Sequence, residues 1–283
     1  MRKFLIFTVL LALGYVAGAQ TQMVRLTRYE GRNITGVNVS NSFRVAIYPS
    51  ENTSAQVVIP AAYEEFLIFE IDSRGVVKIG LRSGYDRVDR GRNNRNTPQL
   101  RATVYLPTLE TLNISGASKV IAQSKEFHSD NTSIKIGGTS HLWDLTLVSA
   151  GCVTMDCSGA SGFRGILNAR EIRSELSGTS DVTLTVCADK GTFKLSGASG
   201  LRIKQSGNIG DLSVECTGAS HFRGQPLAAN SANLKSSGAS SVETGNISGS
   251  LDAEASGASS IRYSGSPAHL NVRSSSASSI RKR

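Results

Sequence analysis

The stretch Phe193-Lys194-Leu195-Ser196-Gly197-Ala198-Ser199-Gly200-Leu201-Arg202 contains the unit that decides the fold of this chain of 283 residues. Its central tetrapeptide, Ser-Gly-Ala-Ser, recurs nine times with small variations, and the steps between the central residues are 22, 21, 19, 19, 21, 20, 19 and 19 residues. The copies begin at Ser115, Gly137, Ser158, Ser177, Ser196, Thr217, Ser237, Ser256 and Ser275. One structural unit therefore returns about every twenty residues, which indicates a solenoid.

Alignment of the nine copies on the central residue indicates which side chains face the core. The residue four places after it is apolar in every copy: Val120, Leu142, Phe163, Val182, Leu201, Phe222, Val242, Ile261 and Ile280. Most residues two and four places before it are also apolar, and polar residues stand between them. This period of two predicts strands with one buried face. The chain is therefore expected to be all-β, a parallel β-helix with about 20 residues per coil.

The motif itself predicts a tight corner between two strands. Glycine can adopt a positive φ and leaves room for a sharp bend. The serine two places after it occurs in all nine copies and faces inward by the same alternation, so its hydroxyl is expected to bond to another hydroxyl or to a backbone carbonyl. A catalytic nucleophile would be needed once, so this repetition indicates a structural role. The last copy has Ser276 in place of glycine, which predicts a less regular final turn.

A column of charges three places before the glycine supports in-register stacking. From Glu175 to Arg273 the sign of the charge alternates at every coil. If equivalent residues stack about 4.8 Å apart, opposite charges become direct neighbours. These carboxylates are therefore predicted to form a solvated charge ladder rather than a pair of acid and base catalysts.

The start of the chain has the pattern of a secretory signal peptide. Residues 1–19 combine a basic start, an apolar stretch and the small-residue site Ala17-Gly18-Ala19. Without Arg2 and Lys3 the formal net charge falls from +9 to +7, so the exported chain stays basic. No later stretch is long and apolar enough to cross a bilayer. The chain is therefore expected in the periplasm, on the outer surface or outside the cell.

Residues 20–110 are interpreted as a β-rich cap that is continuous with the solenoid, and the coils are expected over residues 111–283. Short alternating or aliphatic runs predict strands at residues 37–39, 43–48, 56–60, 66–71, 76–81 and 100–106. They are expected to cover the first coil, because an exposed strand edge invites aggregation. The arginine-rich segment between Leu81 and Arg101 is expected to be a solvated hairpin loop, with an anion-binding arm as the alternative.

The cysteines and histidines do not support a metal or cofactor site. Cys157 and Cys216 share an inward column three coils apart, roughly 14 Å, which is too far for a disulfide. Cys152 and Cys187 fall in other columns, so four buried free thiols are expected. The four histidines are scattered and match no zinc motif. No cofactor and no metal are predicted.

The candidate binding residues come from the column five places after the glycine. It contains Arg164, Thr183, Arg202, Arg223, Glu243, Arg262 and Arg281, with Trp143, His141 and His221 nearby. Outward arginines at coil spacing form a basic stripe, and guanidinium groups bind carboxylates in a bidentate manner, so the stripe suits acidic sugars. The alternative is that arginine is simply a soluble residue on a strand. The ligand-binding candidates are therefore Arg164, Arg202, Arg223, Arg262, His221 and Trp143.

Two runs of residues carry a resemblance to a known family. Residues 41–45 read Asn-Ser-Phe-Arg-Val, and the run from Ala102 through Leu106-Pro107-Thr108-Leu109 to the first Ser-Gly-Ala-Ser leads into the repeats. Over roughly residues 35–280 the chain resembles the exported bacterial family named "putative auto-transporter adhesin, head GIN domain". The resemblance implies a right-handed parallel β-helix, and it carries no catalytic residues over to this chain.

Three functions are open at this point. The first is a non-enzymatic, adhesin-like or cell-envelope protein that presents a rigid face to acidic polysaccharide or another surface component; export argues against nucleic acid. The second is a polysaccharide lyase or hydrolase, but such enzymes need clustered carboxylates, which a ladder of alternating charges does not supply. The third is a structural spacer or assembly subunit. The first is favoured, and no enzymatic activity is expected.

Overall fold

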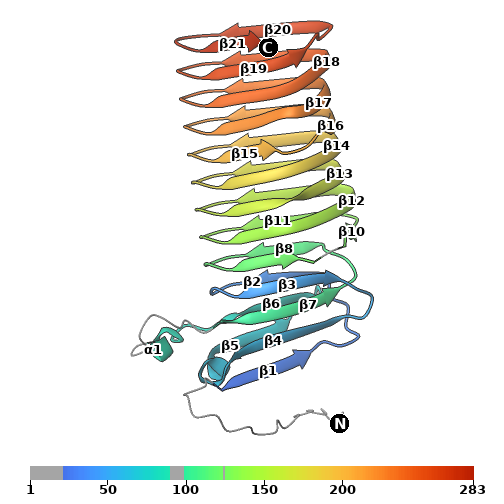
Figure 1. Cartoon of the computed structure of the whole chain (residues 1–283), viewed down its shortest axis with the longest axis vertical. Coiled ribbons are helices and arrows are strands. Elements are labelled where there is room, and N and C mark those ends of the chain that lie inside the picture. The colour runs from blue at the N-terminus through green and yellow to red at the C-terminus, as the bar shows by residue number, and fades with distance from the viewer. Residues whose placement is uncertain (1–21, 90–98, 124) are drawn as a thin grey trace.

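The computed structural model describes residues 22–89, 99–123 and 125–283 and shows a solenoid of stacked parallel strands (Figure 1). Strands β13 (Gly162–Leu176) and β14 (Asp181–Leu195) each begin just after one corner and end just before the next, so one bent strand makes most of a turn. They pair in parallel, with Phe163 opposite Val182. The predicted all-β parallel β-helix is confirmed.

The remaining turns repeat this arrangement with longer or interrupted strands. They are formed by β8 (Thr111–Ile114), β9 (Lys119–Ala122), β10 (Phe127–Ser129), β11 (Thr132–Ile136), β12 (His141–Cys157), β15 (Gly200–Ile203), β16 (Gly207–Cys216), β17 (His221–Ser236), β18 (Ser241–Ala255), β19 (Ser260–Gly265), β20 (His269–Ser274) and β21 (Ser279–Lys282).

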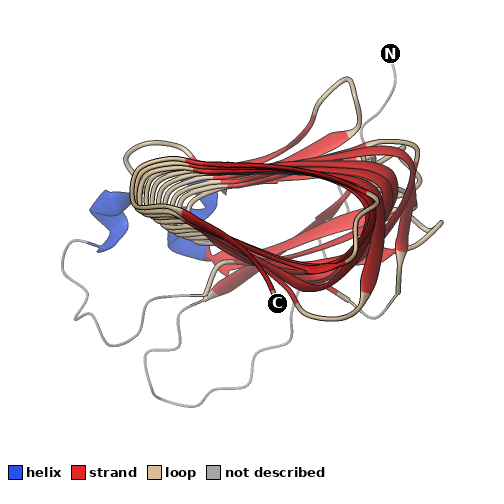
Figure 2. Cartoon of the chain, turned by 90° about the horizontal axis from the view of Figure 1, so that it is seen from above, coloured by secondary structure: helices blue, strands red, loops and turns tan. Residues whose placement is uncertain are grey.

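Seen along the solenoid axis, the corners form one stack from which two long sides diverge (Figure 2). We call these the pre-corner face, which carries the outward row of Glu175 and Lys194, and the post-corner face, which carries the outward row of Arg164 and Arg202. The apolar columns point between the two faces: Leu142, Val182 and Phe222 are fully buried. The core is therefore one continuous column of stacked side chains.

The corner glycines are fixed by backbone geometry. All eight, from Gly116 to Gly257, have φ between +69° and +78°. At Gly138 and each later copy, a Cβ atom would lie 2.4–2.9 Å from the carbonyl oxygen of the glycine one turn before. That oxygen accepts a hydrogen bond of 2.8 Å from the amide that follows the next glycine, as from Ala198 N to Gly178 O. A side chain at this position would therefore push apart two neighbouring corners and disrupt this hydrogen bond.

The final corner differs, as its sequence predicts. Ser276 takes the glycine position with φ +61°. In the part of the chain that the structure describes, Ala277 does not donate the bond that its counterparts donate to the turn before.

Eight of the nine inward serines are buried, Ser278 of the last corner is half-buried, and most are hydrogen-bonded. Ser220 Oγ, for example, donates to the carbonyl oxygens of Thr217 (2.8 Å) and Leu195 (3.2 Å). Ser161 and Ser180 share a hydroxyl contact of 3.2 Å. Ser118 and Ser140, of the first two motif copies, have buried hydroxyls without a partner among the described residues. The predicted structural role of this serine is thus confirmed, with two exceptions at one end.

The charge column of the pre-corner face is in register along the whole solenoid. Lys135, Asp156, Glu175 and Lys194 lie opposite one another in successive turns, and the row continues to Arg273. Among the described residues, two neighbouring pairs in this column come within ion-pair distance: Lys135 with Asp156 at 3.9 Å and Lys194 with Glu175 at 3.7 Å. The stacking is therefore as predicted, while most of the column is an open row of charges.

The order of turns in space departs from the order along the chain near the N-terminus. Strands β2 (Gly36–Val39) and β3 (Arg44–Pro49) form a turn of the solenoid. This turn lies between β8 and β9 on one side and β6 (Val76–Leu81) and β7 (Arg101–Leu106) on the other, all in parallel. Parallel stacking thus exists on both sides of residue 110, and a domain boundary at that residue stays a prediction.

Antiparallel strands cover this end of the stack. Strand β4 (Ser54–Pro60) pairs with β7 and with β1 (Met23–Arg28), and β5 (Leu67–Ile71) pairs with β6. A 3-10 helix, η1 (Ala61–Phe66), connects β4 to β5, and the short α1 (Asp86–Asp89) follows β6. These antiparallel pairings lie at the N-terminal end of the stack, and the role of residues 20–110 as a cap stays a prediction.

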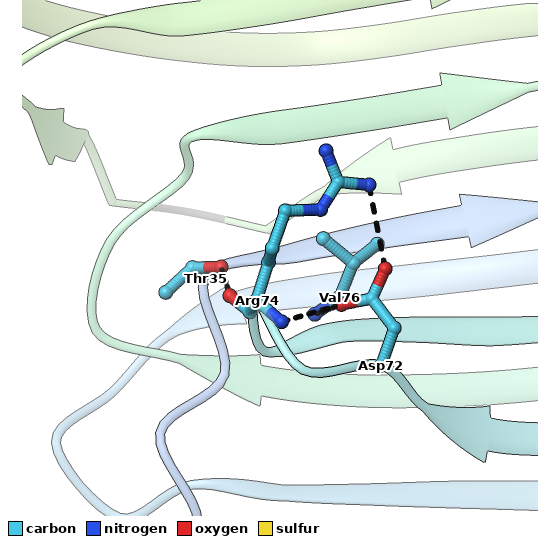
Figure 3. A network of polar contacts seen from close by, with 4 residues as sticks. All are labelled: Thr35, Asp72, Arg74 and Val76. Atoms are coloured by element: carbon cyan, nitrogen blue, oxygen red, sulfur yellow. Dashed lines mark hydrogen bonds and ion pairs between the residues drawn. The ribbon is translucent and has the colours of Figure 1, made fainter.

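The turn between β5 and β6 is held by one carboxylate (Figure 3). Asp72 Oδ1 accepts hydrogen bonds from the backbone amides of Arg74 (2.9 Å) and Val76 (3.0 Å), and the Arg74 guanidinium lies 3.4 Å from Asp72 Oδ2. The Thr35 hydroxyl donates to Arg74 O at 2.7 Å. The amide of Val76 contributes most to a lowered pKa of Asp72, burial opposes it, and Arg74 adds to the lowering. The turn is thereby fixed to the first turn of the solenoid.

The cysteines are free thiols, but two of them are not buried as expected. Cys157 and Cys216 lie in the core, where burial raises the pKa of each to about 12. Cys187 is exposed, because it alternates with the buried Val186 in β14, and Cys152 is half-buried.

Candidate binding face

The predicted arginine column is one outward row of the post-corner face. Arg164, Thr183, Arg202 and Arg223 lie directly opposite one another in successive turns. The row continues through Glu243 and Arg262 to Arg281. At strand spacing, Arg164 and Arg223 are about 14 Å apart along the solenoid axis. The structure therefore brings four of the six candidate residues into a single line.

Three of these arginines keep their charge unpaired. Within the described residues, Arg164, Arg202 and Arg223 have no carboxylate within 4 Å. All three side chains are exposed. An exposed guanidinium without an acid partner is available for an anionic ligand.

Arg262 is different because Glu243 neutralises it. Arg262 Nη1 lies 2.7 Å from Glu243 Oε1, and Arg283 Nη2 lies 3.1 Å from the same oxygen. Burial raises the pKa of Glu243, but the hydrogen bonds from Arg262 and Gln225 and the charge of Arg283 outweigh it, so this pKa is lowered. The run of arginines that are free to bind an anionic ligand therefore ends at Arg223.

His221 stands in the neighbouring outward row, next to the arginines. This row runs through His141, Gly162, Asp181, Gly200 and His221 in register. The His221 ring lies over Gly200, where a Cβ atom would be 2.6 Å from its Nε2. Burial lowers the pKa of His221, Arg223 and Arg202 lower it further, and Asp181 opposes them. Its imidazole is therefore neutral at neutral pH and can donate or accept a hydrogen bond.

Trp143 lies at the N-terminal end of the arginine row but is not in register with it. It faces Ile121 of β9, and the register to the next turn shifts between Leu142 and Leu145. Lys119 Nζ lies 5.2 Å from the centre of the Trp143 ring, and His141 meets the same ring edge-on at 5.8 Å. Sequence reasoning missed Lys119 and Asp181, which the column three places after the glycine would have revealed.

Two surface hollows in the described part of the chain lie away from this face. They measure about 730 and 450 Å³, lie on the pre-corner side of the turns and are lined by residues such as Asp211, Asp252 and Glu175. None of the six candidate residues lines either hollow. Within the described ranges, no three His, Cys, Asp or Glu side chains come together so that they could hold a metal ion. None of the helices described is long and apolar enough to span a membrane.

Fold and face together define an all-β solenoid with a basic long side. The model of the family described as "Putative auto-transporter adhesin, head GIN domain" matches residues 33–267, so the chain belongs to this family. No curated protein matches the chain.

Solved structures share the fold at low sequence identity. An adhesin, named as putative, from Parabacteroides distasonis has a TM-score of 0.63 and 13% identity over 93% of this chain and 97% of that one. A structure named a putative lipid binding protein from the same species has a TM-score of 0.62 and 15% identity over 93% and 97%. A putative adhesin from Parabacteroides merdae has a TM-score of 0.61 and 13% identity over 93% and 96%. These likenesses establish the fold.

Proposed function

We propose that the chain is an exported, non-enzymatic, adhesin-like protein of the cell envelope whose post-corner face binds acidic polysaccharide. The observation that carries this proposal is the in-register row of Arg164, Arg202 and Arg223, exposed and without acid partners among the described residues. The stacked strands hold these side chains at a regular spacing, so binding the repeated carboxylates or sulfates of a polymer orders the guanidinium groups but no backbone segment.

Export is proposed from the pattern of residues 1–19, which lie outside the described residues. The family description, which names an adhesin, agrees with a protein that acts at a surface. Lipid binding is named for one structural neighbour of 15% identity and is not carried over to this chain.

A non-enzymatic role is supported by the arrangement of the carboxylates. Asp156 and Glu175 are neighbours in the pre-corner row, yet each lies within 4 Å of a lysine, Lys135 or Lys194. An acid and base pair for glycoside chemistry requires one carboxyl group with a raised pKa, kept apart from such cations. Turnover of a uronic-acid polymer by the purified chain would contradict this part of the proposal.

The test compares two double variants on an array of anionic and neutral glycans. Arg202→Ala with Arg223→Ala is expected to lose most of the retention on anionic glycans. Lys194→Ala with Lys235→Ala removes the same charge from the pre-corner face and is expected to retain binding. Arg262→Ala is expected to change little, since Glu243 already neutralises that side chain. Unchanged retention of the first variant would rule the arginine row out, and light scattering would then test for a spacer or assembly subunit.

A further inference from the structure

A second basic row crosses the N-terminal turns of the post-corner face. Its residues come from strands that are not consecutive in the sequence, so an alignment of the repeats does not reveal it. Its members come from five strands that are neighbours in space: β1, β4, β7 and β3, which Figure 1 labels, and β9, which pairs with β3. They are Arg25, Val58, Arg101, Arg44 and Lys119, each directly opposite the next. Four of five successive positions are therefore cationic along about 19 Å at strand spacing.

This row has no acid to neutralise it. Across the described part of the chain, Arg25, Arg44, Arg101 and Lys119 have no carboxylate within 4 Å. The Arg101 guanidinium donates to the side-chain oxygen of Gln99 at 2.9 Å, and Lys119 faces the Trp143 ring. The three arginines are exposed. Like charges at strand spacing repel one another, so such a row is costly unless a ligand neutralises it.

Two further outward rows lie beside the basic row, and the three rows together form a strip whose side chains suit a carbohydrate. The adjacent row is uncharged and mostly small: Thr27, Gln56, Thr103, Ala46 and Ile121. Beyond it stand Tyr105 and Tyr48, whose rings stack with centres 4.9 Å apart and planes at 19°. Cations on one edge, an uncharged row between and aromatic rings on the other edge match a sugar chain that carries acidic groups on one side.

From this arrangement we propose that the strip formed by Arg25, Arg101, Arg44, Lys119, Tyr48 and Tyr105 binds a linear anionic glycan that lies along the solenoid axis. A glycan fits better than a lipid head group. The exposed large apolar side chains among the described residues are Met23, Ile166, Leu270 and Val272. Only Met23 stands beside the strip, two residues before Arg25 on the same side of β1, so the strip offers little apolar surface to a membrane.

The choice of a glycan as ligand of the strip rests on the proposed function. The strip itself contains none of the three arginines Arg164, Arg202 and Arg223 on which that function is based. Trp143 and Lys119 lie where the strip meets the row of Arg164, Arg202 and Arg223. A polymer long enough to reach both would contact cations over most of the length of the solenoid, and its affinity would gain from the two linked sites.

The test removes the charges of the strip and, separately, its aromatic rings. With heparin and polygalacturonate as probes, Arg44→Gln with Arg101→Gln and Lys119→Gln is expected to raise Kd about tenfold and to flatten its salt dependence, since three contact charges are lost. Tyr48→Ser with Tyr105→Ser is expected to raise Kd about threefold and to leave the salt dependence unchanged, since only ring contacts are lost. Lys194→Gln with Lys235→Gln and Arg273→Gln removes equal charge from the pre-corner face and should leave Kd unchanged.

Each outcome decides between the two sites. Wild-type affinity in the strip variant, with binding lost in the Arg202 and Arg223 variant, would overturn the strip and leave the proposed function standing. The reverse pattern would support the strip and remove the arginine row. Equal weakening in the pre-corner control would show attraction by net charge alone and overturn the strip. Tighter binding to phosphatidylserine vesicles than to either glycan, or no binding of either probe, would also overturn it. Circular dichroism and thermal melts would establish that every variant is folded.

Discussion

Among single residues, the corner glycine is required for two reasons: its φ is positive, and a carbonyl oxygen of the previous turn lies where a Cβ atom would be. Gly178 has φ +71°, and a Cβ atom there would lie 2.5 Å from Gly159 O. We expect Gly178→Ala to lower the free energy of unfolding by at least about 1–3 kcal/mol, the cost of a non-glycine residue in this region. Urea denaturation measures it. The control Ala219→Ser, at the exposed corner position beside Gly218, should stay within about 0.5 kcal/mol of wild type.

The same constraints predict a gain at the last corner. Ser276 has φ +61°, where an L-residue is strained by about 1–2 kcal/mol, while glycine costs part of this in chain entropy. Ser276→Gly is therefore expected to raise the free energy of unfolding by about 0.5–1 kcal/mol. A loss of stability in the same urea titration would show that the serine side chain contributes something that its geometry does not reveal.

The inward serines should differ in their contribution to stability according to their hydrogen bonds. Ser220 Oγ has two carbonyl acceptors, while Ser140 Oγ is buried without a partner. We expect Ser220→Ala to cost about 1 kcal/mol, because it leaves two buried carbonyls with fewer donors. Ser140→Ala should be neutral or stabilising, because it removes an unsatisfied hydroxyl. Equal effects in thermal unfolding would refute this distinction.

At the scale of elements, the β5–β6 turn should make part of the stability depend on pH. The pKa of Asp72 is lowered below 3.8 in the folded chain, chiefly by the Val76 amide. Its contribution is therefore fully present above the unfolded-state pKa and is lost as the pH falls through the lower, folded-state value. We expect wild type to exceed Asp72→Asn in unfolding free energy above pH 3.8 and to lose this advantage in more acidic buffer. An advantage that does not depend on pH would contradict the electrostatic origin.

Where the twenty-residue period holds, the sequence predicts both the strands and their neighbours. Before the repeats, where the period is absent, it predicts the strands but not which of them pair. All six short runs before the repeats form strands, as expected. Their order in space was not foreseen, because alternation tells which side of a strand is buried but not which strand lies next to it. In the turn of β2 and β3, Phe43 takes the place of the inward serine of the repeats. The carbonyl oxygen of Phe43 accepts a hydrogen bond from Lys119 N, just as the carbonyl oxygen of Ser118 accepts one from His141 N. No motif marks that corner.

The same limit separates the two candidate sites. Arg164, Arg202 and Arg223 follow from one column of the repeat, because one turn leads directly to the next. The strip joins residues that are far apart in the chain, and Arg25 enters it through antiparallel pairing. The neutralisation of Arg262 by Glu243, which also pairs with Arg283, likewise depends on side-chain directions that a column does not give.

At the scale of the whole molecule, each turn is stabilised mainly by its two neighbours, so stability should be graded along the axis. Within the described part of the chain, strand β20 pairs with β18 alone and is exposed along its whole length, with Leu270 51% and Val272 46% accessible. Strand β14 is paired on both sides, and its Val186 and Phe193 are fully buried. In hydrogen exchange, we expect the amides of β20 to exchange at least about tenfold faster than those of β14, because an end turn can open without disturbing the rest. Protection of β20 equal to that of β14 would mean that another surface covers this edge in solution. A dilution series would then show whether that surface is a second copy, because protection by self-association falls with protein concentration.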